Sequence, residues 1–396
     1  MIRLLSVAIT GPLERYAEGF VEHLLSLQYA RLSARNLLYL FAHLSRWLAA
    51  RKLNANALTS RQVSAFLRSR RRAGYTAMCS PSSLDVVLEY LRGVGVVAAQ
   101  AKIGPRSALE RVLARYAEYL THERALASST IGQSLDIAAR FLKKGSTRAT
   151  IRALCVADVR EFLRAMGRTH EKSLAGIGSN LRRLLRFLFV QGLVSRDLSA
   201  AVPSAPSWRG RTLPRGIASS DVQRMLACCD RRTLVGKRDY AILLLLARLG
   251  LRQCEVCALT LDDFDWKRGV LTVHGKGKKT AALPIPRDVG CAVSAYLLRR
   301  PRVDARGVFL RVHAPYRPLR IIGGPILAAS QRAGIAPVRP HRLRHTAATE
   351  MLRRGASLAE IGDVLRHAST QTTAIYAKVD RHALRKLVQP WPGAQP

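Results

Sequence analysis

The chain has 396 residues, enough for two or three domains with buried cores. Its 65 Lys and Arg against 26 Asp and Glu give a formal charge of +39, which points to a polyanion such as nucleic acid as partner. The longest apolar run, Ala241 to Ala247, is far too short to cross a bilayer, and seven cysteines without regular spacing argue against a disulfide framework. We therefore expect a cytoplasmic protein.

The first half of the chain is predicted to be almost wholly helical, and its sequence repeats. The stretch Leu58–Leu67 parallels Leu154–Leu163 in the order of its apolar residues. A parallel of this kind favours a duplicated helical unit over coincidence. We expect one N-terminal helical domain over residues 1–98 and a second helical domain over residues 107–202.

Two linkers are expected to separate the domains. The first covers residues 98–107, and the second covers residues 202–215, where three prolines stand among several arginines. Arg209 and Arg211 of the second linker are expected to contact a nucleic-acid backbone, because a basic linker can follow a line of phosphates.

The second half is expected to form a separate domain over residues 214–380, with a C-terminal tail over 381–396. Within it, Val270–His274 and Ala282–Ile285 have the composition of short strands. The basic turn Gly275–Lys279 lies between them, so the two strands should form a hairpin with lysines at its tip.

Two pairs of residues in this domain have the spacing of a helix capping box. Ser220 with Gln223 is predicted to begin the first helix of the domain, and Ser357 with Glu360 is predicted to begin a later one. In such a box the serine hydroxyl and the acidic or amide side chain each satisfy a backbone N–H group at the helix start.

Two arginines of this domain could hold a phosphodiester. The planar guanidinium of arginine can bind two non-bridging oxygens at once, and it stays protonated at any working pH. Arg252 and Arg344 could therefore hold the phosphate from two sides and stabilise the charge that grows in the transition state. His341 lies three residues before Arg344, so the two share one face of a helix.

A phenol and a lysine could complete the chemistry of phosphodiester cleavage. Tyr376 is the candidate nucleophile, and its phenol needs a positive surround to ionise. The departing 5′-oxygen needs a proton, which Lys276 is suited to give. The like charges of Lys278 and Lys279 should lower the pKa of Lys276, and both lysines are expected to contact DNA.

In this order the residues resemble the tyrosine recombinase or phage integrase family of site-specific DNA strand-exchange enzymes. The resemblance covers about residues 214–380. The family pattern of Arg, Lys, His-x-x-Arg, His or Trp, and Tyr matches six positions of this sequence: Arg252, Lys276, His341, Arg344, His367 and Tyr376.

The resemblance implies a mainly α fold, with helical DNA-binding domains before an α-rich catalytic domain that carries a small antiparallel β-sheet. It implies that Tyr376 forms a 3′-phosphotyrosine link with double-stranded DNA and releases a 5′-hydroxyl, which requires neither a metal ion nor a nucleotide cofactor. It further implies a homotetramer on DNA, with the tail docking onto a neighbouring subunit. Residues 107–200 resemble the core-binding domain of the family, and the N-terminal domain would be a second copy.

The sequence departs from the family pattern at two positions. Arg366 precedes His367 where the family usually has Gly, and Arg342 follows His341 where it often has Asp. Both changes add positive charge near the phosphate. Glu255 matches an acidic residue that the family commonly carries, whereas His345 is interpreted as a helix histidine that helps to shape the site.

Three alternatives remain open at this point. The same residues would serve a type IB topoisomerase-like enzyme that relaxes DNA without strand exchange. A catalytically inactive relative that only binds DNA would also keep the fold. The extra N-terminal copy could bind an additional DNA subsite, or it could pack against its neighbour or mediate assembly.

Overall fold

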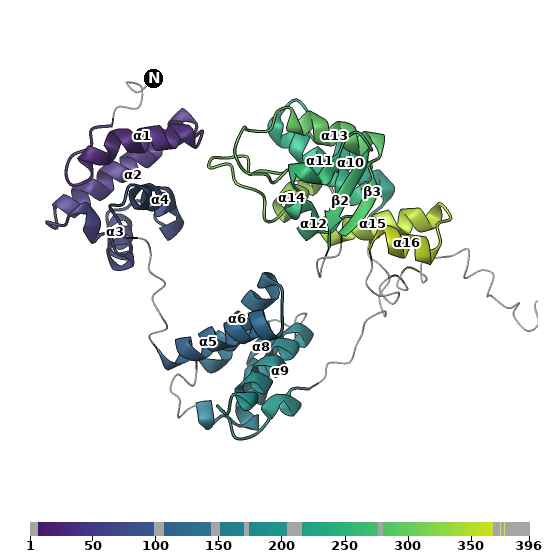
Figure 1. Ribbon diagram of the computed structural model, residues 1–396, viewed down its shortest axis with the longest axis horizontal. Helices are drawn as coiled ribbons and strands as arrows, with labels where there is room; N and C mark the ends of the chain where they lie inside the picture. The colour runs from purple at the N-terminus through teal and green to yellow at the C-terminus, as the bar shows by residue number, and fades with distance from the viewer. Residues whose placement is uncertain are drawn as a thin grey trace, which may run out of the picture. The chain divides into compact units, whose positions relative to one another are not determined.

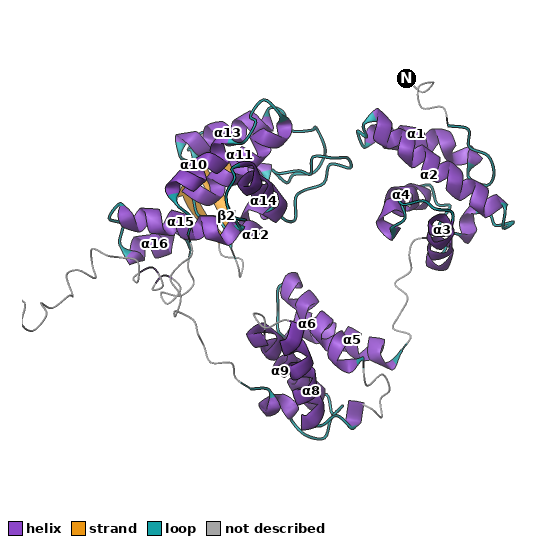
Figure 2. Cartoon of the chain, turned by 180° about the vertical axis from the view of Figure 1, so that it is seen from behind, coloured by secondary structure: helices purple, strands orange, loops and turns teal. Residues whose placement is uncertain are grey.

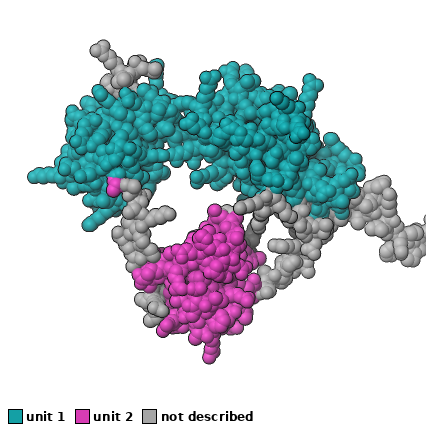
Figure 3. Space-filling model, viewed as in Figure 1, with its two compact units in different colours: residues 1–97, 210–396 teal, residues 98–209 magenta. Residues whose placement is uncertain are grey.

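The computed structural model describes residues 7–98, 107–143, 151–169, 174–203, 216–275 and 280–366, together with Thr373 and Tyr376. The chain divides into two compact units, one over residues 98–209 and one that combines residues 1–97 with 210–396 (Figure 3). The three-domain division remains a prediction. In the described part of the chain, no helix combines the length and apolarity needed to cross a membrane.

The N-terminal residues form a small helical bundle with its own core. Phe20 stacks on Phe41 with ring centroids 4.6 Å apart, and Trp47 meets the edge of Phe66 at 5.6 Å. These rings are buried because their helices present apolar residues every three or four positions. The elements are η2 (Glu14–Tyr16), α1 (Ala17–Ser26), α2 (Arg31–Ala49), η3 (Ala55–Ala57), α3 (Ser60–Arg72), η4 (Pro81–Leu84) and α4 (Asp85–Gly93) (Figure 1).

The unit over residues 98–209 is also helical. Its core gathers around Tyr116 and Phe187, whose rings lie 4.9 Å apart. Ser107 and Glu110 form a capping box that starts the first helix. The elements are α5 (Ala108–Glu118), a π-helical turn η5 (Tyr119–Glu123), α6 (Ser128–Leu142), α8 (Val156–Thr169), α9 (Leu174–Val190) and η7 (Leu198–Ala201).

Helix α11 (Leu234–Arg248) forms the centre of the third core. Residues Ala241 to Leu246 are all at most 2 % exposed, so this stretch of the helix is buried and apolar on every side. It packs against helices on several sides, which explains the apolar run noted in the sequence. The other helical elements here are α10 (Ser219–Ala227), α12 (Gln253–Ala258), η8 (Leu261–Asp263), α13 (Arg287–Leu297), α14 (Gly323–Arg332), α15 (Pro340–Arg353) and α16 (Leu358–Val364).

One three-stranded antiparallel sheet lies among these helices (Figure 2). Its strands are β1 (Phe264–Asp265), β2 (Val270–His274) and β3 (Thr280–Pro284), in that order across the sheet. Leu271 of β2 is paired with Leu283 of β3, and both side chains are buried. The expected fold class and the hairpin are confirmed, although β3 begins two residues earlier than the sequence suggested.

The two capping predictions have different outcomes. Ser357 and Glu360 form the expected capping box at the start of α16. The prediction for Ser220 is wrong, because α10 already begins at Ser219 and its N-cap residue, Ala218, has no side-chain acceptor. Spacing alone does not show which serine the backbone places at the N-cap.

Candidate active site

Two arginines that are far apart in sequence are anchored to adjacent backbone carbonyls. Arg344 on α15 is buried at 2 % exposure and donates to the carbonyls of Gly250 and Leu365. Arg252, the N-cap residue of α12, donates through Nη2 to the carbonyl of Arg366 at 3.2 Å. The segment after α16 therefore brings the two candidate phosphate-binding side chains together.

Gly250 makes this close packing possible. Its φ of +57° lies in the left-handed region, and a Cβ there would stand 2.5 Å from Cδ2 of Leu365. Any larger residue would push Leu365, and with it the carbonyl that Arg344 binds, out of position. The need for close packing against Leu365 thus explains why a glycine stands two residues before Arg252.

Glu255 fixes the position of Arg252 through two hydrogen bonds. Its carboxylate is 2 % exposed and accepts from the backbone N–H of Arg252 at 2.7 Å and from Nη1 at 2.6 Å. Burial acts to raise the pKa of Glu255, but hydrogen bonds from Arg252 and the charge of Arg366 outweigh it and lower that pKa. The carboxylate is therefore ionised and places a negative charge next to the guanidinium groups of Arg252 and Arg366.

Two histidines of α15 lie beside each other, and one of them contacts the candidate nucleophile. His341 and His345 lie one turn apart on α15, with ring centroids 4.3 Å apart. Nδ1 of His345 forms a hydrogen bond of 2.8 Å with the phenol oxygen of Tyr376. Tyr376 is 1 % exposed and packs in a small cluster with residues such as Leu365.

Burial keeps this histidine and this phenol neutral. Burial and then the charges of His341 and Arg344 lower the pKa of His345 to about 4. Burial raises the pKa of Tyr376 to about 12, although the charge of Arg344 acts in the opposite direction. The positive surround that the sequence suggested is present, but in this structure it is outweighed by desolvation.

The remaining candidates from the sequence lie outside the described residues. These are the two active-site candidates Lys276 and His367 and the four DNA-contact candidates Lys278, Lys279, Arg209 and Arg211. The structure brings together Arg252, His341, Arg344 and Tyr376, and it adds two side chains, His345 and Arg366, as direct neighbours of this set. The sequence already indicated that His345 lies near the site, because it follows His341 by four residues and so shares its face of the helix.

Comparison with known proteins identifies the arrangement. Residues 215–382 match the model of the phage integrase family. The integrase/recombinase y4rA of Sinorhizobium fredii (strain NBRC 101917 / NGR234) is 38 % identical over 97 % of this chain and 95 % of its own length. Tyrosine recombinase XerD of Mycobacterium tuberculosis (strain CDC 1551 / Oshkosh) is 34 % identical over 71 % of this chain and 96 % of its own length. The chain belongs to the phage integrase family of tyrosine recombinases.

A solved structure agrees with this assignment at the level of the fold. The crystal structure of XerH site-specific recombinase bound to a palindromic difH substrate covers 74 % of this chain and 98 % of its own, with a TM-score of 0.54 and 16 % identity. Members of this family cleave and rejoin DNA strands, so the chain is a site-specific DNA recombinase.

Arg366 distinguishes this recombinase from the usual family pattern. Its φ is +55°, a left-handed conformation that glycine adopts without cost. Its side chain is nevertheless 10 % exposed and donates from Nη2 to Glu255 at 2.8 Å. Glu255 is therefore shared between Arg252 and Arg366, and a third guanidinium lies beside the two expected ones.

We expect Arg366→Gly to slow DNA cleavage about tenfold and to lower stability by a few kcal/mol at most. Glycine removes a backbone strain of about 1 kcal/mol, which offsets part of the lost ion pair. With Arg366 gone, Glu255 has only Arg252 to neutralise it and should hold that guanidinium away from the phosphate. Single-turnover cleavage and DNA affinity, measured side by side, would separate these effects.

A matched control exists for the backbone part of this change. Lys52 also has a positive φ, of +53°, on an exposed loop. Lys52→Gly should relieve similar strain without altering cleavage. The double variant Arg366→Gly/Glu255→Gln should recover part of the rate, and wild-type cleavage by Arg366→Gly alone would show that this arginine has no role in positioning.

The low pKa of His345 predicts a pH-dependent stability. An unfolded histidine titrates near pH 6.5, whereas His345 titrates at about 4 when folded, so the unfolded chain binds more protons between these values. The free energy of unfolding should therefore fall as the pH drops through this window. We expect His345→Asn to weaken that fall between pH 7.5 and 5 by on the order of 1 kcal/mol, allowing for partial exposure. Urea denaturation at both pH values would measure it, and equal pH dependence in the two proteins would contradict it.

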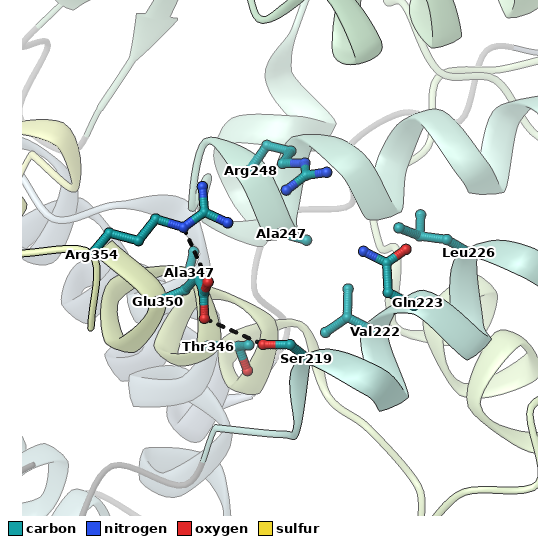
Figure 4. Close-up of a pocket in the computed structure, with 10 residues that line it drawn as sticks. All are labelled: Ser219, Val222, Gln223, Leu226, Ala247, Arg248, Thr346, Ala347, Glu350 and Arg354. Atoms are coloured by element: carbon teal, nitrogen blue, oxygen red, sulfur yellow. Dashed lines mark hydrogen bonds and ion pairs between the residues drawn. The ribbon is translucent and has the colours of Figure 1, made fainter. Parts of the chain in front are cut away.

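A separate pocket lies near this site, with a volume of about 80 Å³ between α10, α11 and α15 (Figure 4). On its wall, Glu350 accepts a hydrogen bond from the hydroxyl of Ser219 at 3.3 Å and pairs with Arg354 at 3.1 Å. None of the catalytic candidates described above lines it. Its volume suits a few water molecules rather than a nucleotide.

Proposed function

We propose that this recombinase cleaves DNA through Tyr376, with Arg252 and Arg344 binding the scissile phosphate. The observation that carries the proposal is the anchoring of both guanidinium groups on the carbonyls of Leu365 and Arg366. Burial and then the charge of Arg252 lower the pKa of Arg344 to about 10, so Arg344 remains charged at neutral pH. Two fixed positive groups would stabilise the charge that develops on the phosphate oxygens.

The proposed reaction exchanges one phosphodiester bond for another. The phenol oxygen of Tyr376 attacks phosphorus, the bond to the 5′-oxygen breaks, and the 3′-phosphate remains linked to Tyr376. The phenol proton would pass to His345, whose Nδ1 lies 2.8 Å from the phenol oxygen before Tyr376 moves toward the phosphate. Lys276 would protonate the departing 5′-oxygen, and a 5′-hydroxyl of a second strand would reverse the steps to rejoin DNA.

The buried phenol indicates a resting arrangement. At 1 % exposure, Tyr376 must leave its apolar cluster before its oxygen can reach a phosphate. Proton transfer from a phenol with a pKa of about 12 to a histidine with a pKa of about 4 is strongly unfavourable. Bound phosphate adds negative charge near His345, which would raise its pKa and favour the transfer.

We further propose that the enzyme acts as a homotetramer on two DNA duplexes and serves a mobile element such as a transposon. The match to the integrase/recombinase y4rA over nearly the whole chain supports the role in recombination on which this proposal builds. Action in the cytoplasm is consistent with seven free cysteines.

Recovery of covalent adducts would test this function. DNA that remains attached to the protein in SDS, purified with EDTA present throughout, should carry a 3′-phosphotyrosine and map to discrete sites. Plasmids with one or two copies of the mapped site would then separate the alternatives. Recombination that requires two copies supports the proposal, relaxation of a one-copy plasmid by monomers supports the topoisomerase-like reading, and DNA binding without adducts supports an inactive relative.

A further inference from the structure

The N-terminal bundle contains a long segment with no acidic residue. Between His23 and Leu84 the sequence holds ten Lys and Arg and not one Asp or Glu, although 26 of the 396 residues are acidic. This segment supplies helices α2 and α3. The acidic residues of the bundle lie on η2, α1 and α4 instead.

The two acidic helices contact each other in the core, although α1 also packs against α2. Phe20 of α1 and Tyr90 of α4 lie 5.3 Å apart within the shared core. The carboxylates of the bundle are confined to η2, α1 and α4, and among its charged residues α2 and α3 carry only Lys and Arg. Such a polarised surface attracts an extended polyanion.

Three arginines form a stripe along the solvent side of α3. The buried residues of this helix are Val63, Phe66, Leu67 and Arg70. On the opposite side lie Arg61, Arg68 and Arg72, all exposed. At 100° per residue they fall within an arc of about 40°, and at 1.5 Å per residue they extend over about 16 Å.

The side chains of these three arginines form no recorded ion pair or hydrogen bond within the described residues. Arg70 contacts Nδ1 of His43 at 2.7 Å, and Arg71 donates to the carbonyl of Cys79 at 2.7 Å, so these two support the bundle. The structure records no ion pair, hydrogen bond or ring contact for the side chains of the stripe, within the ranges it describes. A charge without an internal partner is available to an external one.

Helix α8 in the other helical unit provides an internal comparison. In the repeat, Gln62 of α3 corresponds to Asp158 of α8, and Ala65 corresponds to Glu161. The apolar positions are shared, but the carboxylates of α8 are replaced by neutral residues in α3. The stripe is thus positive without the acidic neighbours that α8 keeps.

Helix α2 carries an exposed aromatic side chain next to one of its own arginines. The guanidinium of Arg35 lies over the ring of Tyr39 at 5.5 Å and donates to its hydroxyl at 3.0 Å through Nη2. Both residues are exposed on α2. Basic residues interleaved with an exposed aromatic ring are typical of surfaces that bind nucleic acid.

We propose that the N-terminal bundle is a second DNA-contacting module, which binds the phosphate backbone through the Arg61, Arg68 and Arg72 stripe. XerD matches only 71 % of this chain while covering 96 % of its own length, so a recombinase of the family can lack such a segment. The extra module would lengthen the DNA segment that each protomer covers. The inference takes from the proposed function only that the partner is DNA.

Salt-dependent binding of the full chain would test this module. The probe is a labelled 40-base-pair duplex of arbitrary sequence, and the variant is Arg61→Gln/Arg68→Gln/Arg72→Gln. Each lost phosphate contact should reduce the slope of log affinity against log salt by about 0.9, so the triple variant should lose about 2 to 3 in slope. Its affinity at about 0.1 M salt should fall at least tenfold.

Controls separate this inference from general effects of charge and folding. Arg15→Gln, on the acidic side of the bundle, should change affinity much less than Arg68→Gln, although both remove one exposed charge. A thermal melt checks that the triple variant is folded. At saturating protein, the triple variant should still form Tyr376 adducts, so a failure of adduct formation in the wild type would count against the proposed function alone.

Two results would overturn the inference. An unchanged affinity and salt slope in the triple variant would show that the stripe does not contact DNA. Unchanged DNA binding together with altered sedimentation would assign the same surface to contacts between protein subunits.

Discussion

Tyr376→Phe should abolish covalent protein–DNA adducts, with a loss of at least about 10³-fold, and should leave DNA affinity within about twofold. The substitution removes the attacking oxygen and keeps the ring that packs in the cluster with Ala348, Ile361 and Leu365. Among the described residues, the substitution removes one hydrogen bond, to His345, so the protein should remain folded. SDS-resistant adducts and DNA binding would be measured on the same preparation.

Tyr296→Phe is a matched control for this experiment. Tyr296 is also 1 % exposed, and its hydroxyl accepts a hydrogen bond of 3.1 Å from the backbone of Leu310. The same oxygen is removed from a buried ring of the same part of the chain. Adducts should persist in this variant, and their persistence in Tyr376→Phe would show that another residue is the nucleophile.

Arg252→Ala should slow cleavage by about 10²- to 10⁴-fold and weaken DNA binding by less than about tenfold. A guanidinium that binds the phosphate is worth most in the transition state, where the charge on the oxygens is largest. The side chain of Arg252 is 34 % exposed, so its loss should disturb the fold less than loss of the buried Arg344. Rates under single-turnover conditions and equilibrium affinities would be compared.

Arg248→Ala supplies the matching control, since Arg248 lies at the end of α11, four residues before Arg252. Its side chain is 43 % exposed and pairs with Asp288 at 2.9 Å, away from the phosphate site. This variant should cleave at nearly the wild-type rate. If Arg252→Ala instead lost binding and cleavage to the same extent, Arg252 would be an ordinary phosphate anchor.

Some features of the fold and the site could be predicted from the sequence, and others could not. The family could be inferred from the sequence because six residues occur together in the family's order: Arg252, Lys276, His341, Arg344, His367 and Tyr376. The hairpin was predictable because two short stretches with the composition of strands, Val270–His274 and Ala282–Ile285, flank a turn that contains glycine. The capping prediction at Ser220 failed because the start of a helix depends on where the preceding backbone enters it.

The state of the nucleophile could not be read from the sequence. A tyrosine near arginines suggests a phenol that ionises readily, yet burial raises the pKa of Tyr376 to about 12. Burial depends on packing against residues such as Ile361 and Leu365, which reach Tyr376 only through the fold. For the same reason His345 was interpreted as a helper until its ring was found to contact the phenol.

By itself, the sequence determined the family, the chemistry and the polyanionic partner, because these follow from residue types, their order and net charge, all of which are local or additive. Only the tertiary structure decided that Arg252 and Arg366 share Glu255, that Tyr376 is buried, and that Arg61, Arg68 and Arg72 form an exposed stripe without partners among the described residues. Ion pairs and pKa values depend on distance and desolvation, and both are set by which distant segments the fold brings together.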